Sequence, residues 1–351
     1  MPNNHPTNHM IGCNCPSCLG EATRRDFLIG LGAFGAAALL PSPLRSQATA
    51  PAQTFRIDVH QHFSSPGWLA EVTKRNMGNA NMRTWTPEIA LNELDKTGTA
   101  AAMLSLTRPG IWFGDVAIAR RLARESNEYG AKLVSDRPKR FGLFASLPLP
   151  DVEGCLREIE YVFDTLKVDG IAVMSNYGDI YLGDPRIAPV MDELNRRKAI
   201  VFEHPVREDR ENPLNGIELV TETTRTIHSL LYNTTVVRCP DIRFIFSHGG
   251  GTLGNSIGRM GNMGQKLPKG LMYELQKFYY DTAGAVSPST LLSYKAFAPV
   301  PHILFGTDFP LGGGGIANIL KGLQDNGGFS VSELRAIQAE NVLALIPRLK
   351  A

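Results

Sequence analysis

Short apolar runs alternate with amphipathic helical patterns along most of this chain, from about residue 56 to residue 346. Most of the runs are rich in Val, Ile and Phe and are continuously apolar, which is typical of parallel strands buried on both faces. We expect eight strands, at Arg56–Phe63, Ala101–Thr107, Phe141–Leu149, Gly170–Ser175, Ala199–His204, Ile242–His248, Phe278–Thr282 and Ile303–Asp308. The alternation restricts the fold to the α/β class.

Helical patterns fill the intervals between these strands. They lie at Thr86–Thr97, Asp115–Asp136, Asp151–Leu166, Pro185–Arg197, Ile217–Arg238, Ser287–Tyr294 and Ser330–Ile346. Eight strands that alternate with helices predict a (β/α)₈ TIM barrel, as a single domain over residues 51–351. A doubly wound open sheet is the alternative, but no Gly-x-Gly-x-x-Gly turn follows the first strand.

Residues 1–50 have the pattern of a cleavable export signal. Arg24 and Arg25 precede an apolar run at 29–40 that is too short to span a membrane, and small residues suited to cleavage follow. The paired arginines favour the twin-arginine export machinery as a partner and a periplasmic or otherwise exported protein. An ordinary N-terminal helix is the alternative. Cys13, Cys15 and Cys18 belong either to a metal knuckle or to the removed leader.

The overall charge is close to neutral, with 36 Lys and Arg against 34 Asp and Glu. This balance does not favour a broad basic surface, so we expect no nucleic-acid partner. The sequence contains no run of roughly 18 or more apolar residues, so we also expect no membrane-spanning helix.

Polar residues stand at the carboxyl ends of several predicted strands. His60 and His62 end the first strand, and side chains two residues apart on a strand share a face. His204 ends the fifth strand, His248 the sixth and Asp308 the eighth. In a barrel these ends meet at one mouth. We therefore predict that His60, His62, His204 and Asp308 bind one divalent metal ion, with zinc as first choice and manganese as the alternative.

The predicted roles of the other polar residues at the mouth differ. His248 precedes Gly249-Gly250-Gly251, where backbone and substrate can approach closely. We interpret His248 as a catalytic acid or base beside the metal, and Asp308 as a ligand that also moves a proton. The fourth strand has no lysine that could be carbamylated to bridge two ions, which favours a single ion. We expect Asp58 on the face of His60, as a partner of a ligand.

Arg259 follows His248 by eleven residues. It is either a surface cation or a clamp for a substrate carboxylate, which arginine binds through two parallel hydrogen bonds. The spacing alone leaves both interpretations open. Two insertions, residues 64–85 and 205–216, follow the first and fifth strands and are candidate walls of a substrate site.

Four motifs, taken in order, resemble the amidohydrolase superfamily. They are Ile57-Asp58-Val59-His60-Gln61-His62, Phe202-Glu203-His204-Pro205, Phe246-Ser247-His248-Gly249-Gly250-Gly251 and Phe305-Gly306-Thr307-Asp308-Phe309-Pro310. The chain from about residue 55 to 346 looks more narrowly like the metal-dependent decarboxylases of aromatic and enoic acids. Aminocarboxymuconate-semialdehyde decarboxylase typifies that branch, to which methylsalicylate and resorcylate decarboxylases also belong.

The resemblance implies roles for individual residues. The matching positions make His60, His62, His204 and Asp308 the metal ligands and His248 the catalytic histidine. Arg259 matches an arginine that binds the substrate carboxylate, often across a dimer interface, so we expect a homodimer. Gly254 departs from the pattern, since relatives often have proline there, and the approach to the following helix is expected to differ.

The activity that the resemblance implies is non-oxidative decarboxylation of a small aromatic or enoic carboxylic acid. This is a carboxy-lyase reaction and needs no redox cofactor. A metal-dependent hydrolase of a lactone, ester or amide is the alternative, because hydrolases share the four motifs. A third hypothesis is an exported barrel that binds a metal or a ligand without turnover.

Overall fold

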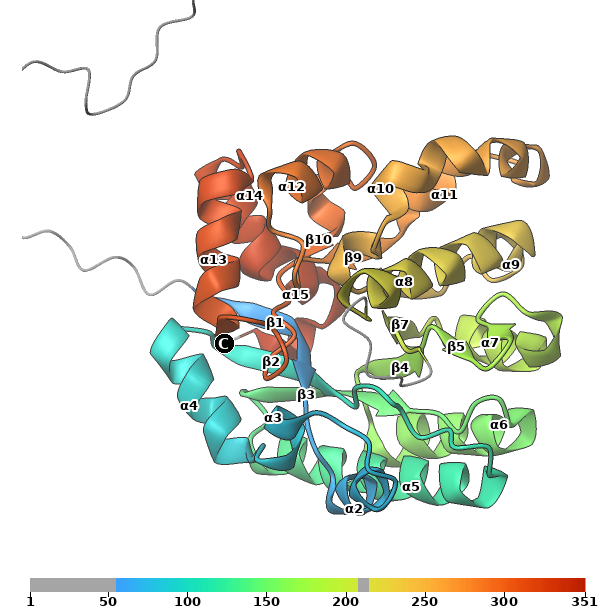
Figure 1. The fold of residues 1–351 in the computed structure, drawn as a ribbon, viewed down its shortest axis with the longest axis vertical. Helices are drawn as coiled ribbons and strands as arrows, with labels where there is room; N and C mark the ends of the chain where they lie inside the picture. The colour runs from blue at the N-terminus through green and yellow to red at the C-terminus, as the bar shows by residue number, and fades with distance from the viewer. Residues whose placement is uncertain (1–54, 208–214, 351) are drawn as a thin grey trace, which may run out of the picture. The chain divides into compact units, whose positions relative to one another are not determined.

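The computed structural model describes residues 55–207 and 215–350, all within one compact unit, Ala52–Ala351 (Figure 1). The predicted export signal and its cysteines lie outside the described residues, as does part of the second insertion. The boundary between signal and mature chain therefore stays a prediction.

Eight parallel strands form the central sheet, in the order β1-β2-β3-β4-β7-β8-β9-β10. Their bounds are β1 Ile57–His62, β2 Ala101–Ser105, β3 Phe141–Ser146, β4 Gly170–Met174, β7 Ile200–His204, β8 Arg243–Phe246, β9 Tyr279–Asp281 and β10 Ile303–Leu304. The backbone N–H groups of Val59 and His62 donate to the carbonyl oxygens of Phe305 and Phe309, each at 2.8 Å. These bonds join β1 to the segment after β10, so the sheet is a nearly closed barrel, as predicted.

Helices surround the strands (Figure 1). Their bounds are α2 Pro66–Lys74, α3 Ala80–Arg83, α4 Pro87–Thr97, α5 Val116–Asp136, α6 Val152–Tyr161, α7 Ala188–Arg196, α8 Asn215–Tyr232, α9 Thr235–Arg238, α10 Leu253–Ser256, α11 Leu271–Lys277, α12 Pro288–Lys295, α13 Gly315–Asn326, α14 Val331–Arg335 and α15 Asn341–Leu345. A 3-10 segment, Ile257–Lys266, follows α10, and a small hairpin, β5 (Asn176–Tyr177) with β6 (Ile180–Tyr181), follows β4. Among the described residues, no helix is long and apolar enough to cross a membrane.

Local sequence signals explain where several helices begin and end. The Thr86 hydroxyl accepts a hydrogen bond from the N–H of Ile89 at 3.2 Å, and Pro87 occupies the first turn of α4. Gly98 ends that helix in the left-handed conformation, at φ 65°. Ser330 and Glu333 form the predicted capping box at α14.

Several predicted helices are not continuous α-helices in the structure, and two examples show why. The pattern at Ile217–Arg238 is divided into α8 and α9, because Thr234 takes a left-handed φ of 55° between them. The pattern at Ser330–Ile346 is divided into α14 and α15 by one wider helical turn, Ala336–Glu340. Amphipathic spacing does not reveal either local change of backbone.

The barrel interior holds a layer of apolar side chains beneath the mouth. Phe144 and Phe202 stack there with ring centroids 5.5 Å apart, and Val342 and Leu345 of α15 pack against the same cluster. Burying a phenylalanine or leucine side chain contributes about 1.5–3 kcal/mol, so this layer stabilises the floor of the mouth. The ring of Phe202 also meets that of His60 edge to face, with centroids 5.0 Å apart. Apolar packing thus leads directly to the polar residues at the strand ends.

Candidate metal centre

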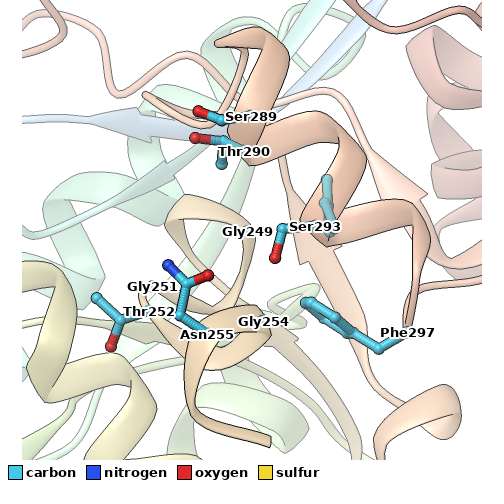
Figure 2. A pocket seen from close by; sticks show the side chains of 10 residues that line it. Gly249, Gly251, Thr252, Gly254, Asn255, Ser289, Thr290, Ser293 and Phe297 are labelled. Carbon is cyan, nitrogen blue, oxygen red and sulfur yellow. The ribbon is translucent and has the colours of Figure 1, made fainter. Parts of the chain in front are cut away.

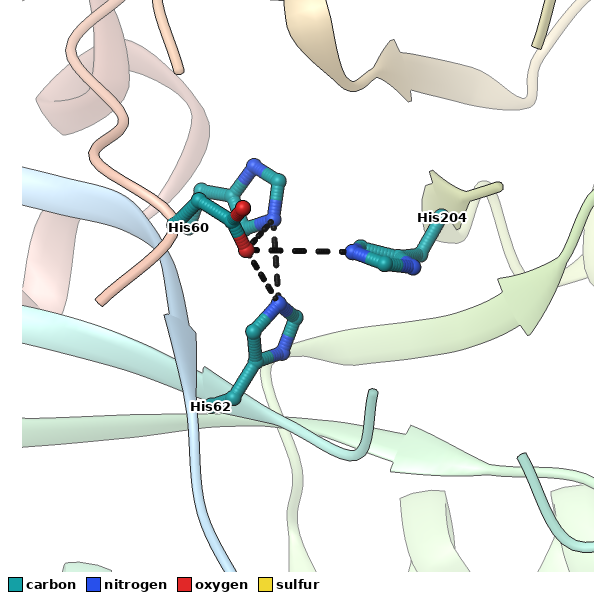
Figure 3. A group of neighbouring side chains, drawn as sticks. His60, His62 and His204 are labelled. Atoms are coloured by element: carbon teal, nitrogen blue, oxygen red, sulfur yellow. Dashed lines mark hydrogen bonds and ion pairs between the residues drawn. The ribbon is translucent and has the colours of Figure 1, made fainter. Parts of the chain in front are cut away.

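The predicted metal ligands converge at the carboxyl end of the barrel (Figure 3). His60 and His62 come from β1, His204 ends β7, and Asp308 lies in the turn after β10. Nε2 of His62 lies 2.9 Å from Oδ1 of Asp308, and Nε2 of His60 lies 3.3 Å from the same oxygen. The four candidate ligand atoms all lie within 4.8 Å of one another.

Each imidazole is oriented by a hydrogen bond on its other nitrogen. Nδ1 of His60 donates to Oδ2 of Asp281 at 2.7 Å. Nδ1 of His204 lies 3.0 Å from the carbonyl oxygen of Pro205, and Nδ1 of His62 lies 3.3 Å from that of Ser105. A carbonyl oxygen can only accept, so Nδ1 of His62 and of His204 carries the proton, and the Nε2 lone pairs of these two residues face the common centre.

Burial and charge set the protonation of the cluster. Burial lowers the pKa of His62 and of His204, which keeps both imidazoles neutral at neutral pH. Burial also opposes a charge on His60, but Asp281 and Asp308 outweigh it and raise the pKa of His60 to about 10. Burial alone would raise the pKa of Asp308, but the adjacent imidazoles of His204, His60 and His62 hold it well below its usual range.

This donor set fits a divalent metal ion. Nε2 of His204 is buried and has no hydrogen-bond partner within residues 55–207 and 215–350. A buried polar atom without a partner is costly, and a metal ion at the centre would satisfy it. Three imidazole nitrogens and one carboxylate oxygen suit zinc or another borderline first-row ion.

His248 lies beside these ligands rather than among them. Its ring centroid is 5.2 Å from that of His60 and 5.9 Å from that of His204. The backbone takes a left-handed φ of 52° at this residue. Nδ1 donates to the carbonyl oxygen of Ala283 at 2.9 Å, and the backbone N–H donates to Oδ1 of Asp281 at the same distance. The position agrees with the predicted place of an acid or base next to the metal.

Comparison with known proteins identifies the family. The amidohydrolase family model matches residues 57–317, and this range contains all four ligands and His248. The chain belongs to the amidohydrolase family.

Relatives of this amidohydrolase include named decarboxylases. It is 37% identical over 325 residues to decarboxylase yanB of Aspergillus niger, covering 84% of this chain and 88% of the relative. It is 34% identical to the 6-methylsalicylic acid decarboxylase of Penicillium expansum, and this match covers 73% of this chain and 85% of the relative. A dihydroxybenzoic acid decarboxylase from Polaromonas sp. JS666, solved with bound manganese and the inhibitor 2-nitroresorcinol, has the same fold. The TM-score is 0.72 at 20% sequence identity, and the match covers 85% of this chain and 98% of that one.

Asp281 is a site residue of this amidohydrolase that sequence reasoning missed. Its carboxylate accepts from His60 through Oδ2 and from the backbone of His248 through Oδ1. It therefore connects a metal ligand to the residue proposed for proton transfer. The signal was present in the sequence, since Asp281 stands near the carboxyl end of the predicted strand Phe278–Thr282.

Asp58 contacts a candidate ligand residue, as expected, but it does so through the backbone of that residue. The register between β1 and β2 shifts between Asp58 and Gln61, so the two-residue alternation does not continue through this strand. The Asp58 carboxylate contacts the backbone N–H of His60 at 3.0 Å rather than its ring. It also accepts from Nε2 of Gln61 at 2.9 Å, and from the N–H and hydroxyl of Thr307 at 3.1 and 2.5 Å. Asp58 thus links β1 to the turn that carries Asp308.

Arg259 is not brought into the ligand cluster. It is exposed in the 3-10 segment Ile257–Lys266, and within the described part of the chain it makes no ion pair. Its role as a carboxylate clamp stays a prediction.

Gly254 lies in α10, close to α12. A pocket of about 240 Å³ adjoins it, lined in part by Ser289 and Ser293 of α12 (Figure 2). A Cβ atom at Gly254 would lie 1.8 Å from Oγ of Ser293. The glycine thus permits a helix contact that any larger side chain would displace.

Proposed function

We propose that this amidohydrolase is a metal-dependent decarboxylase of a small aromatic carboxylic acid. The observation that carries the proposal is the convergence of His60, His62, His204 and Asp308 at the barrel mouth, with His248 beside them. The named decarboxylases that match most of the chain at 34–38% identity supply the reaction class.

A divalent ion held by these four ligands would supply a Lewis acid that polarises an oxygen of the substrate. We propose zinc, on the basis of the imidazole-rich donor set. Manganese is the alternative, since the solved dihydroxybenzoic acid decarboxylase contains it.

The protein's own groups would handle the proton. In decarboxylation the ring carbon takes a proton, its bond to the carboxyl carbon then breaks, and release of CO₂ restores the aromatic ring. His248 is the proposed acid or base: its Nδ1–H is engaged by Ala283, so Nε2 is the atom that exchanges a proton. Asp308 is the proposed second proton carrier, because its carboxylate contacts Nε2 of His62 at 2.9 Å.

Arg259 is the proposed clamp for the substrate carboxylate, contributed across the interface of a homodimer. Its exposure and its lack of an ion pair within the described residues support an arginine available to a second subunit. Export by the twin-arginine route to the periplasm is also proposed, and it rests on the sequence of residues 1–50 alone.

The test is CO₂ release from 6-methylsalicylic and 2,6-dihydroxybenzoic acids by protein purified with zinc or with manganese. We expect release from at least one acid, and a fall of about 10²–10⁴-fold in the rate for His248→Asn, the range that a positioned acid or base contributes. His302→Asn is the matched control, since His302 precedes β10 at the opposite end of the barrel. Hydrolysis of lactones or esters without CO₂ release from any acid would contradict the proposal.

A further inference from the structure

A second cavity, of about 410 Å³, opens at the same end of the barrel as the ligands. Its walls come from segments that follow β2, β4 and β7, and from the first insertion. Both insertions named from the sequence contribute, through Arg75 and Met77 in one and Val206 and Arg207 in the other. The volume falls within the roughly 300–1,000 Å³ typical of small-molecule sites.

This cavity shares the β4–β7 edge with the metal centre. Met174, in its wall, is the strand partner of His204. The next residue, Ser175, donates its backbone N–H to the carbonyl oxygen of His204 at 2.9 Å. Val206, also in the wall, lies two residues beyond His204 and donates its N–H to Oγ of Ser175 at 3.0 Å. The cavity wall is therefore built on the strand ends that also carry His204.

The walls are mainly flat and apolar. Trp112, Phe113 and Tyr177 supply aromatic rings, and Met77 and Met174 supply flexible thioether side chains that adapt to a ligand. The Tyr177 hydroxyl is already engaged, because it accepts the N–H of Met174 at 3.0 Å.

The polar groups of the wall are paired within the protein. Nε of Arg75 donates to Glu71 at 2.8 Å, and its guanidinium lies 4.4 Å from the centroid of the Phe113 ring. Arg207 pairs with Glu218 at 2.5 Å. The Asn176 amide donates to the carbonyl oxygen of Val206 at 3.0 Å. A charged ligand group would have to break these pairs, whereas an apolar group would not.

We propose that this cavity is a specificity subsite that receives an apolar alkyl or aryl substituent on the ring of the aromatic acid. This inference rests on the proposed function for the position of the carboxyl group at the metal centre. It adds the substrate class: ring-substituted acids larger than the simple hydroxybenzoates.

Val206 is the position at which to test the subsite. Its backbone bonds to Ser175 and Asn176 do not depend on its side chain, so Val206→Phe fills the cavity and Val206→Ala enlarges it. Val237→Phe, at an exposed position on α9, is the matched control. Thermal unfolding of each variant checks that the fold is retained.

The measurement is the ratio of kcat/KM for 6-pentylsalicylic acid to that for 6-methylsalicylic acid. We expect the ratio to fall about tenfold or more in Val206→Phe and not in Val237→Phe, since a few methylene contacts in an apolar pocket are worth at least that factor. The ratio should not fall in Val206→Ala. An equal ratio in Val206→Phe and the natural protein would overturn the subsite.

Binding measurements separate this result from failure of the proposed function. If neither acid loses CO₂, calorimetry with the same two acids measures the affinity ratio directly. A lower affinity ratio in Val206→Phe than in the natural protein then supports the subsite, although decarboxylation has failed. An unchanged affinity ratio, or no binding of either acid, overturns the subsite.

Discussion

The carboxylate of Asp58 helps to place Asp308, a candidate metal ligand, by holding the residue next to it. Asp308 takes a left-handed φ of 63°, which costs a non-glycine residue on the order of 1–3 kcal/mol and must be held by its surroundings. Asp58 holds the preceding residue, Thr307, through both its N–H and its hydroxyl, and it holds the N–H of His60 as well. One side chain therefore fixes ligands from two ends of the chain relative to each other.

Removal of the Thr307 hydroxyl tests this link. Thr307→Val keeps the side-chain shape and loses the hydrogen bond to Asp58, so we expect metal affinity to fall about 10–100-fold, as for other residues that orient ligands. Thr307→Ser retains the hydroxyl and should restore most of the affinity. The measurement is competition for the metal with a chelator of known affinity.

A control for this series lies at the other end of the barrel. Thr99 is also buried, and its hydroxyl pairs with that of Thr97 at 3.1 Å, just before β2 begins. Thr99→Val should leave metal affinity near that of the natural protein. Equal losses in Thr99→Val and Thr307→Val would show that general destabilisation, not ligand placement, explains the effect.

At the scale of elements, strand β1 shows what sequence periodicity can and cannot predict. The apolar run correctly placed a strand with two histidines at its carboxyl end. Its alternation did not reveal the register shift between Asp58 and Gln61. A bulge depends on how two strands pair, and a single-strand pattern does not contain that information.

The contact between α10 and α12 gives a prediction for Gly254. Gly254→Ala should lower the free energy of unfolding by about 1–3 kcal/mol, the usual cost of an extra methyl group in a packed contact. The double variant Gly254→Ala/Ser293→Ala should recover part of the lost unfolding free energy, because the Ser293→Ala change removes the Oγ atom that the new Cβ would meet. Denaturant unfolding measures both.

Gly258→Ala serves as the comparison. Gly258 lies in the segment that follows α10, and no atom lies within 4 Å of the position that its Cβ would take. We expect little change in unfolding free energy there. A loss in Gly258→Ala as large as that in Gly254→Ala would show that glycine is required along the whole segment, not at the α12 contact.

For the whole molecule, the sequence was sufficient to predict the barrel and the convergence of the four candidate ligands. Parallel strands place their carboxyl ends at one mouth, so His204 and Asp308 could be grouped with His60 although they are far apart in the chain. Asp281 could have been found by the same rule. The walls of the 410 Å³ cavity could not be predicted from the sequence, because they depend on how several loops, such as the one that contains Trp112, pack against one another.

The dependence of CO₂ release on bound metal tests the central claim most directly. Protein stripped with a chelator would be reloaded in steps, with metal content and CO₂ release from carboxyl-labelled 6-methylsalicylic acid measured at each step. We predict a rate proportional to occupancy up to one ion per chain, and loss of both metal and rate in His204→Ala. Full release by the stripped protein, or full occupancy and rate in His204→Ala, would contradict the claim that these four ligands hold the catalytic ion.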